Sequence, residues 1–333
     1  MPVVQSLGIP GTDAITLALG GVLSVGFGDV SGAISNPGSR LDSRSFDVMV
    51  SCSPSFLKGN FDDDSGEHAV SLSEMGNFSY SCMGRINTFG FLAGASVNRE
   101  MPFETVYYIP AMGEQQGTSG EMIVDAGFLE SYVGLSWDAA EWLCIGGSFG
   151  SREHTESFEL IRGQEESSSA ITDIGWSVRE ATLAAGFTVP LKMLSIGFSW
   201  KSPGEYIPSQ IAAGMIFNTG SNSGIGTEVD IIFPEGESIV SARLFSQMQP
   251  WDSFFLRGGV SFLGSRECVS REGFGFSAGV GVILSDVTVN CGFSRSRIAG
   301  EQGWPEYEDM DRYEGSSSVF SLGVGYSLPE SLL

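Results

Sequence analysis

From residue 45 to the C-terminus, hydrophobic and polar residues alternate with a period of two. In "FGFSAGVGV", residues 274–282, phenylalanine, alanine and valine occupy the even positions, and glycine and serine occupy the odd ones. The same alternation occurs in residues 287–294, 320–328, 194–200 and 142–149. Such alternation indicates β-strands with one apolar face and one small or polar face. No amphipathic helical pattern appears after residue 45.

The alternating segments predict about 14 strands joined by two kinds of connection. The strands are expected at residues 45–56, 67–83, 88–100, 122–137, 142–151, 170–188, 194–201, 209–217, 227–233, 239–247, 253–263, 273–284, 287–297 and 316–328. The short connections are 84–87, 138–141, 189–193, 218–226, 248–252 and 285–286, and the long ones include 101–121, 152–169 and 298–315. An even strand number with short turns on one rim and long loops on the other is typical of outer-membrane barrels. The predicted fold class is therefore all-β, a transmembrane antiparallel β-barrel.

Charge and aromatic residues favour the membrane barrel over a soluble one. The formal net charge is −23, and most of it falls in the expected long loops. Trp137, Trp142 and Trp251 lie at strand ends toward the short-turn rim, and Trp200 lies toward the other rim. Aromatic residues at both interfaces are expected of a membrane barrel. A soluble β-sandwich or barrel also alternates, but it explains neither the one-sided loop lengths nor the one-sided charge.

The composition excludes several function classes. So acidic a chain offers no basic face to nucleic acid. Five cysteines without CxxC spacing and only two histidines argue against a disulfide framework, a zinc site or a histidine-rich metal centre. A GxSxG match at Ser148 lies within an expected strand and lacks the strand–turn–helix context of a nucleophile elbow. No acid–base pair or phosphate loop indicates an enzyme, and no cofactor or metal is expected.

Residues 1–44 do not share the strand pattern of residues 45–333. No basic region follows Met1, so an export signal is expected to lie upstream or to have been removed. The uncharged run at residues 14–27 is shorter than the roughly 20 residues that a membrane-spanning helix needs. Four apolar residues have the spacing of one face of a short helix, namely Ile15, Leu19, Val22 and Leu23. The turn "SNPG" follows at residues 35–38.

The small residues on the polar strand face leave room for residues 1–44 inside the barrel. A barrel of this strand number encloses more space than glycine, serine and threonine fill. Arg243 and Arg257 are among the few charged residues expected to point inward. We therefore expect residues 1–44 to form a plug, or hatch, in the lumen of a barrel formed by residues 45–333. The alternative is a tail that packs outside the barrel.

The N-terminal stretch "TLALGGVLSVGFGDVSGAISNPGSRL" resembles the hatch of the FadL/TodX-type outer-membrane transport proteins and the related PorV-like barrels. In those families a segment rich in small residues leads through an aspartate to an "NPA" turn before the first strand. Here Asp29 and the sequence Asn36, Pro37 and Gly38 stand at these places, with glycine replacing alanine. Residues 194–217 resemble the mid-barrel pattern of the family, with Trp200 at the usual tyrosine position.

The resemblance implies passive uptake of hydrophobic small molecules, long-chain fatty acids or hydrocarbons, across the bacterial outer membrane. It implies a gate at the hatch, formed here by Asp29, Asn36, Pro37 and Gly38, and a lateral exit at a kinked third strand. The expected third strand contains Gly90 and Gly94, which fit either a kink or ordinary inward-facing glycines.

The expected loop 101–121 holds an apolar cluster, which is the candidate site where a ligand first enters. The cluster comprises Met101, Phe103, Tyr107, Tyr108, Ile109 and Met112. An apolar cluster in an exposed loop indicates a ligand or a partner, although loop residues also pack on each other. The expected partners are a hydrophobic small molecule and outer-membrane lipid or lipopolysaccharide. Two other functions stay open: a PorV-like barrel that binds and hands on exported proteins, and a structural or adhesive surface barrel.

Overall fold

The computed structural model describes residues 13–19, 21–25, 35–39, 46–63, 66–99, 103–109, 118–162, 169–204, 209–220, 222–233, 238–265, 271–300 and 312–328. Within these residues one short helix, α1 (Ala14–Ala18), precedes the strands. The strands are β1 (Phe46–Asp63), β2 (Gly66–Ile86), β3 (Phe89–Arg99), β4 (Phe103–Ile109), β5 (Thr118–Ala140), β6 (Leu143–Arg162), β7 (Ser169–Pro190), β8 (Leu194–Lys201), β9 (Ser209–Gly220), β10 (Ser223–Phe233), β11 (Ile239–Trp251), β12 (Phe254–Ser265), β13 (Arg271–Leu284), β14 (Val287–Gly300) and β15 (Arg312–Leu328).

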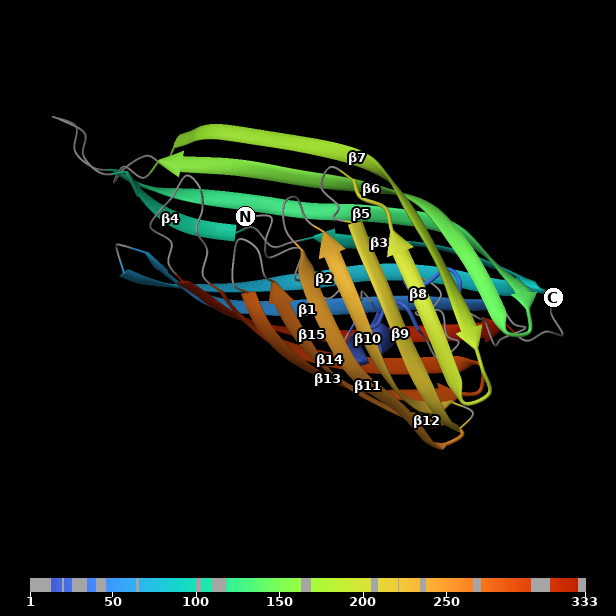
Figure 1. Ribbon diagram of the computed structural model, residues 1–333. Coiled ribbons are helices and arrows are strands. Elements are labelled where there is room, and N and C mark those ends of the chain that lie inside the picture. Colours follow the sequence, from blue (N-terminus) through green and yellow to red (C-terminus); the bar gives the residue numbers. More distant parts are fainter. Residues whose placement is uncertain are drawn as a thin grey trace.

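Fourteen of these strands form a closed antiparallel barrel (Figure 1). Each strand pairs with its neighbour in the chain, except that β1 pairs with β15 and β3 pairs with β5. The pairing of β3 with β5 closes the barrel, and β4 pairs only with the first part of β5. The predicted fold class and strand number are therefore confirmed.

Several strands are longer than their alternation predicts. The expected loop 101–121 contains β4, which pairs with residues 118–124 of β5. The expected loops 57–66 and 152–169 are also largely strand, because β1 continues to Asp63 and β6 to Arg162. The connection expected at 218–226 is shorter, because β10 begins at Ser223. Alternation detects a strand only where hydrophobic and polar residues follow each other in turn, and the sequence of β4, FETVYYI, does not do so.

The outward face of the barrel is apolar. Side chains such as Val133, Leu244 and Phe276 remain exposed. Aromatic rings touch along this face, with centroids 4.8 Å apart for Phe293 and Phe320 and 6.3 Å apart for Phe56 and Phe320. So extensive an apolar surface is suited to hydrocarbon rather than to water. No helix among the described residues has the length and apolarity needed to cross a membrane.

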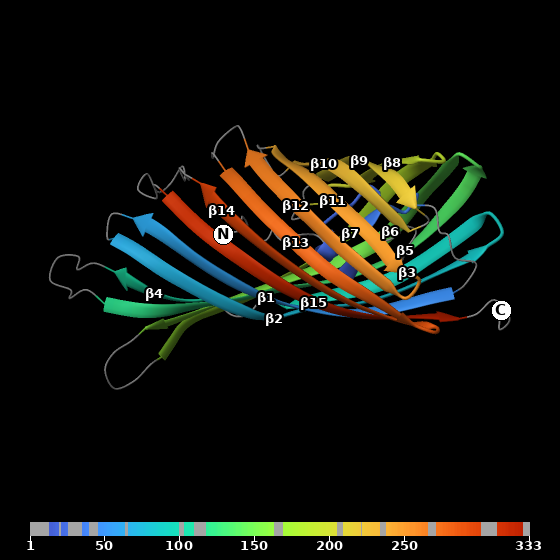
Figure 2. The same ribbon diagram turned by 90° about the horizontal axis from the view of Figure 1, so that it is seen from below.

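The described part of the N-terminal stretch, residues 13–19, 21–25 and 35–39, is here called the N-terminal segment. Its helix contacts β12, β13, β14, β15 and β1, and both ribbon views show it within the barrel (Figure 2). The Asp13 carboxylate caps α1, because Oδ1 accepts the amides of Ile15 and Thr16, each at 2.9 Å. The sequence predicted a helix that reaches Leu23, and this is wrong, because the helix ends at Ala18. A helix this short depends on the wall around it for stability.

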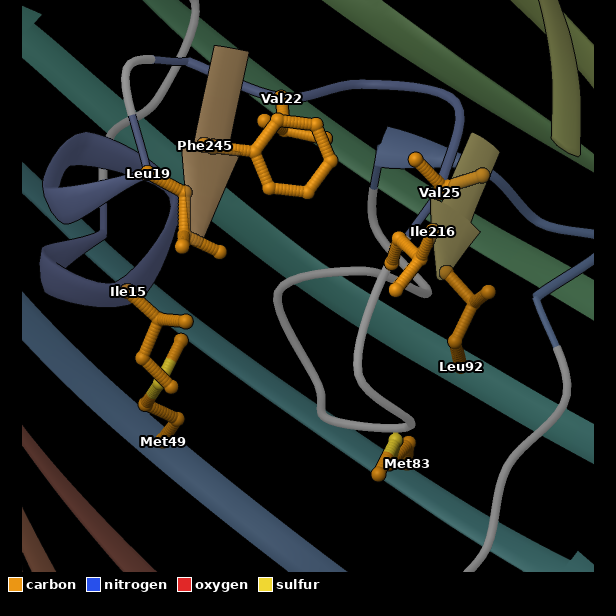
Figure 3. Packing of buried hydrophobic residues seen from close by; sticks show 9 residues of the cluster. All are labelled: Ile15, Leu19, Val22, Val25, Met49, Met83, Leu92, Ile216 and Phe245. Carbon is orange, nitrogen blue, oxygen red and sulfur yellow. The ribbon is translucent and has the colours of Figure 1, made fainter. Parts of the chain in front are cut away.

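Apolar residues of the N-terminal segment pack against inward-facing residues of the wall (Figure 3). Four cluster residues come from the segment and five from the barrel, namely Ile15, Leu19, Val22 and Val25 against Met49, Met83, Leu92, Ile216 and Phe245. Ile15 lies beside Met49, whereas Val25 lies above Ile216 and Leu92. This cluster is the hydrophobic core of the described structure, and it lies between the segment and the barrel.

Candidate functional site

Glycines of the barrel wall make room for the backbone of the N-terminal segment. A Cβ atom at Gly186 would lie 1.9 Å from Asn36 Oδ1, and one at Gly197 would lie 2.0 Å from the Ser24 carbonyl oxygen. A Cβ atom at Gly292, on the other side of the barrel, would lie 2.4 Å from the Ala14 carbonyl oxygen. No side chain fits in these spaces. The wall is therefore shaped to the path of the segment.

The turn at residues 35–39 is fixed by Asn36, which is fully buried. Its Nδ2 donates to the carbonyl oxygens of Ser24 at 2.6 Å and Phe187 at 3.2 Å, and its Oδ1 accepts the Gly38 amide at 2.9 Å. A Cβ atom at Gly38 would lie 2.2 Å from the Gly186 carbonyl oxygen. This contact gives a physical reason for glycine, rather than alanine, as the last residue of the "NPG" turn. Pro37 is also buried, and its carbonyl oxygen would lie 2.1 Å from a Cβ atom at Gly146.

A buried carboxylate on β10 holds the middle of the segment, at Leu23 and Ser24. Glu228 accepts the Leu23 amide at 2.9 and 3.0 Å, the Ser24 amide at 2.6 Å and the Ser24 hydroxyl at 2.5 Å. Arg243 Nη1 donates to Glu228 at 3.1 Å and also to Asp230. Glu228 and Asp230 are at most 1% exposed. Buried charges require such paired, hydrogen-bonded partners.

The sequence analysis placed Arg243 inward but did not single out Glu228 and Asp230. The alternation of β10 carried the necessary signal, because both carboxylates share the inward parity of Gly224 and Gly226. The contacts of Glu228 with Leu23 and Ser24 join residues 205 and 204 positions apart, so they have no local sequence signal.

Polar wall residues also hold the C-terminal end of α1 and the inner wall near the short turns. Ser277 Oγ donates to the Ala18 carbonyl oxygen at 2.9 Å, which satisfies a helix-terminal acceptor. Arg257, placed inward as predicted, donates to Gln247 at 2.6 Å and to Asn290 at 2.8 Å. These contacts bind Nε and Nη1 of the buried Arg257 guanidinium to neutral side chains of the wall.

A second ionic cluster lies nearer the long-connection rim. Lys201 Nζ lies 3.0 Å and Arg152 Nη2 3.5 Å from the Glu130 carboxylate. These three residues come from β8, β6 and β5. Along β5, Glu130 lies six residues toward the long-connection rim from Ser136, which pairs with Gly146 beside the Asn36 turn. The cluster therefore lies on the long-connection side of the segment, inside the lumen.

The described part of β3 keeps a continuous register around the two glycines singled out from the sequence. Residues 89–98 pair with β2, and residues 89–99 pair with β5, without a register shift at Gly90 or Gly94. A Cβ atom at Gly94 would lie 2.4 Å from the Tyr132 hydroxyl oxygen, so this glycine faces the lumen and accommodates a ring. The described residues therefore contain no bulge at either glycine, and a kink that opens the wall stays a prediction.

The apolar cluster predicted to receive ligand is only partly described. Phe103, Tyr107, Tyr108 and Ile109 belong to β4, so they form a strand paired with β5 rather than a loop. Met101 and Met112 lie outside the described residues, as does Asp29 of the predicted gate. Of that gate, Asn36, Pro37 and Gly38 are brought together against the wall.

Together these features define a closed barrel whose lumen contains an N-terminal segment, held by wall residues such as Glu228 and Ser277. Solved structures that are similar to this one include a FadL homologue from Pseudomonas aeruginosa, with 12% sequence identity, a TM-score of 0.65 and coverage of 95% of this chain and 98% of that chain. The toluene transporter TbuX of Ralstonia pickettii matches with 11% identity, a TM-score of 0.63 and coverage of 95% and 99%. A mutant of the monoaromatic hydrocarbon channel TodX matches with 13% identity, a TM-score of 0.66 and coverage of 95% and 98%.

These similarities show the fold of the FadL/TodX-type outer-membrane channels over nearly the whole chain. It is the fold of a transporter family rather than of an enzyme family. No protein-family model matches the sequence, and no curated protein matches it significantly.

Proposed function

We propose that the protein is a channel of the bacterial outer membrane for passive uptake of hydrophobic small molecules. Residues 1–44 act as the gate, or hatch, and residues 45–333 act as the barrel. The observation that carries this proposal is the N-terminal segment, which lies against the inner wall of a barrel with the fold of hydrocarbon channels. A channel plugged in this way needs a segment that moves when ligand arrives.

The contacts of the segment suit such a movement. Glu228 and Asn36 both form hydrogen bonds with Ser24, and elsewhere the wall meets the segment with glycines and an apolar cluster. Apolar packing has little directional preference, so sliding over it costs less than breaking the anchors. A ligand that enters the apolar cluster competes with Val25 and its neighbours for the same surface. Opening then amounts to loss of a few identifiable hydrogen bonds.

The substrate class is argued from the character of the contacts and from the related folds. Among the similar structures, TbuX is named as a toluene transporter and TodX as a monoaromatic hydrocarbon channel. The apolar cluster between segment and wall includes Met49, Met83 and Leu92, with Tyr132 packed against it. Methionine adapts its shape to different apolar partners. We therefore assign uncharged or weakly amphipathic hydrophobic molecules as the substrates.

A reversible disulfide between segment and wall tests the gate. A Cβ atom at Gly214 would lie 2.7 Å from Ser24 Oγ, so cysteines at both positions are within reach of a disulfide. In liposomes, the oxidised double variant Ser24→Cys/Gly214→Cys is expected to lose toluene uptake, and dithiothreitol is expected to restore it. Ser24→Cys alone is the matched control and should be indifferent to dithiothreitol. Equal uptake by the oxidised and reduced double variants would contradict a gate formed by this segment.

A PorV-like role in handing on exported proteins is favoured by one observation. Strands β5, β6 and β7 have 23, 20 and 22 residues, whereas β8 has 8 and β12 has 12. A membrane-spanning strand needs only about 9–11 residues, so the long strands extend beyond the bilayer on one side. This extension is the surface on which an exported protein would bind in the PorV-like role. Native mass spectrometry of protein from its own membranes separates the two roles. A bound hydrocarbon or fatty acid supports the channel, and a bound protein without small ligand supports the alternative.

A further inference from the structure

A hydroxyl on the inner wall is buried without a hydrogen-bond partner. Ser51 of β1 is 2% exposed, and its Oγ forms no hydrogen bond among the described residues. A Cβ atom at the paired Gly323 of β15 would lie 3.0 Å from this oxygen and 3.5 Å from Ala14 Cβ. Ser51 Oγ therefore faces the lumen beside the start of α1. Because an unpaired buried hydroxyl is unfavourable, it indicates a position where a ligand group or a water molecule binds.

The hydroxyl of Ser51 belongs to a row of three serines. Ser51 pairs with Ser79 of β2, and Ser79 pairs with Ser96 of β3. Ser79 and Ser96 share the inward parity of Met83 and Leu92, whose side chains face the N-terminal segment. Directly opposed residues have Cβ atoms about 4.5–5.5 Å apart, so the three side chains adjoin one another on the lumen side. A hydroxyl both donates and accepts, so the row complements another hydroxyl.

An apolar surface adjoins the serine row on the side of the short turns. Met49 lies two residues before Ser51 on the same face of β1, and Ile15 of the helix lies beside it (Figure 3). Met83 and Leu92 belong to the same hydrophobic cluster. They lie toward the turn between β2 and β3, four residues from the serines of their strands. This part of the wall therefore matches a molecule with an apolar body and one hydroxyl group.

Charges near Ser51 favour a neutral polar group over a carboxylate. Asp13, which precedes Ala14, is 5% exposed, and its carboxylate caps α1. A second carboxylate from a ligand would repel that of Asp13, and the repulsion is strong where water is excluded. Arg257 donates to Asn290 of β14, and β15 lies between Asn290 and Ser51. The hydroxyl group of a phenol or an alcohol meets no such repulsion.

We propose that Ser51, with Ser79 and Ser96, binds the hydroxyl group of a neutral hydrophobic ligand, namely a phenol or an alcohol. The apolar part of the ligand lies against Met49 and its neighbours in the cluster. This site deepens the proposed channel function and rests on it, because the ligand reaches Ser51 from the lumen. The bound ligand takes the place of the start of α1, so binding at Ser51 displaces the N-terminal segment.

Fluorine NMR titration of the protein in nanodiscs tests the site, with empty nanodiscs as the correction for partition into lipid. The probes are p-trifluoromethylphenol, trifluoromethylbenzene and p-trifluoromethylbenzoate, which differ only in the group para to the trifluoromethyl carbon. The unaltered protein should bind the phenol more tightly than either of the others. One net hydrogen bond corresponds to about two- to tenfold in affinity, so Ser51→Ala should weaken phenol binding by that factor. Its affinity for trifluoromethylbenzene should stay unchanged.

Ser199→Ala, at a buried serine on the inward face of β8, is the matched control and should bind the phenol like the unaltered protein. Equal binding of the phenol and trifluoromethylbenzene, unchanged phenol affinity in Ser51→Ala, or an equal loss in Ser199→Ala would overturn the site. Tightest binding of the benzoate would overturn the assignment to a neutral hydroxyl. If none of the three probes binds, the channel itself is contradicted, so the two failures are distinguishable.

Discussion

At the scale of single residues, the lumen is organised around groups that accept the backbone of the N-terminal segment. Glu228 accepts the amides of Leu23 and Ser24, and Asn36 bridges Ser24 to the wall at Phe187. Wall glycines such as Gly197 and Gly292 make room where that backbone approaches at Ser24 and Ala14. The segment is thus held both through its backbone and through its own Ser24, Asn36 and apolar side chains.

Glu228→Gln is expected to loosen the N-terminal segment without unfolding the barrel. The amide keeps one acceptor but turns a donor toward the segment, so a buried amide loses its partner at a cost of about 1–3 kcal/mol. Limited proteolysis of the segment in detergent should accelerate, while the heat-modifiable migration of the barrel on gels stays unchanged. Glu272→Gln, at an exposed carboxylate, is the control. Unchanged proteolysis in Glu228→Gln would show that Glu228 does not anchor the segment.

Gly186→Ala is expected to displace the Asn36 turn, because the new Cβ would lie 1.9 Å from Asn36 Oδ1 and 2.7 Å from the Phe198 carbonyl oxygen. The cross-linking rate of the Ser24→Cys/Gly214→Cys pair measures the displacement and should fall several-fold. Gly264→Ala is the matched control, since nothing lies within 4 Å of a Cβ atom there. An equal rate in both alanine variants would contradict close contact at Gly186.

At the scale of elements, the pairing of β3 bears on whether a ligand leaves through the barrel wall or through the lumen. Its register is continuous with both neighbours around Gly90 and Gly94, so a lateral exit requires the pairing of β3 with β2 or β5 to open. The extension of β4 and β5 beyond the expected strands places the predicted ligand-receiving residues next to this part of the wall. Exit through the wall therefore requires these strand pairings to open, whereas exit through the lumen leaves them intact.

A disulfide across the β3–β5 seam distinguishes the two exits. Val97 and Leu129 pair across this seam, and both are exposed. If ligand leaves between these strands, oxidised Val97→Cys/Leu129→Cys should lose hydrocarbon uptake several-fold, with recovery on reduction. The matched control is Val229→Cys/Ala242→Cys, which staples β10 to β11 elsewhere in the wall. Full uptake with the β3–β5 seam closed would exclude exit through it.

At the scale of the whole molecule, the outward apolar face and the inward polar face are exchanged relative to a soluble protein. Exposed residues such as Leu244 and Phe276 surround a lumen that contains buried Glu228 and Arg243. On the outer surface of β6 and β7 the apolar residues give way to polar ones, where Arg179 contacts Ser151. That change marks one edge of the band that would face lipid.

Leu244→Arg is expected to destabilise the barrel in phospholipid vesicles by about 2–4 kcal/mol, because a charge near the middle of the band meets hydrocarbon. Ser177→Arg lies outward on β7 beside Glu153, beyond the apolar residues, and should cost no more than about 1 kcal/mol. Denaturant titration of the vesicle-folded protein measures both values. Equal costs would contradict the position of the band.

Much of the fold follows from sequence pattern alone. Alternation predicted the fold class, the number of barrel strands and the inward orientation of Arg243 and Arg257, because a strand with one apolar face leaves a period of two. It missed β4 and the outer parts of β1 and β6, since hydrophobic and polar residues do not alternate regularly there. It also extended the helix to Leu23, although α1 ends at Ala18.

What the sequence by itself determined is local: which residues face each side of the wall, and that Asn36, Pro37 and Gly38 form a turn. Only the tertiary structure decided which wall residues meet that turn. The contacts of Glu228 with Leu23 and Ser24, and of Gly186 with Asn36, join positions more than 140 residues apart. Such contacts depend on barrel closure and strand register, which alternation within single strands does not encode.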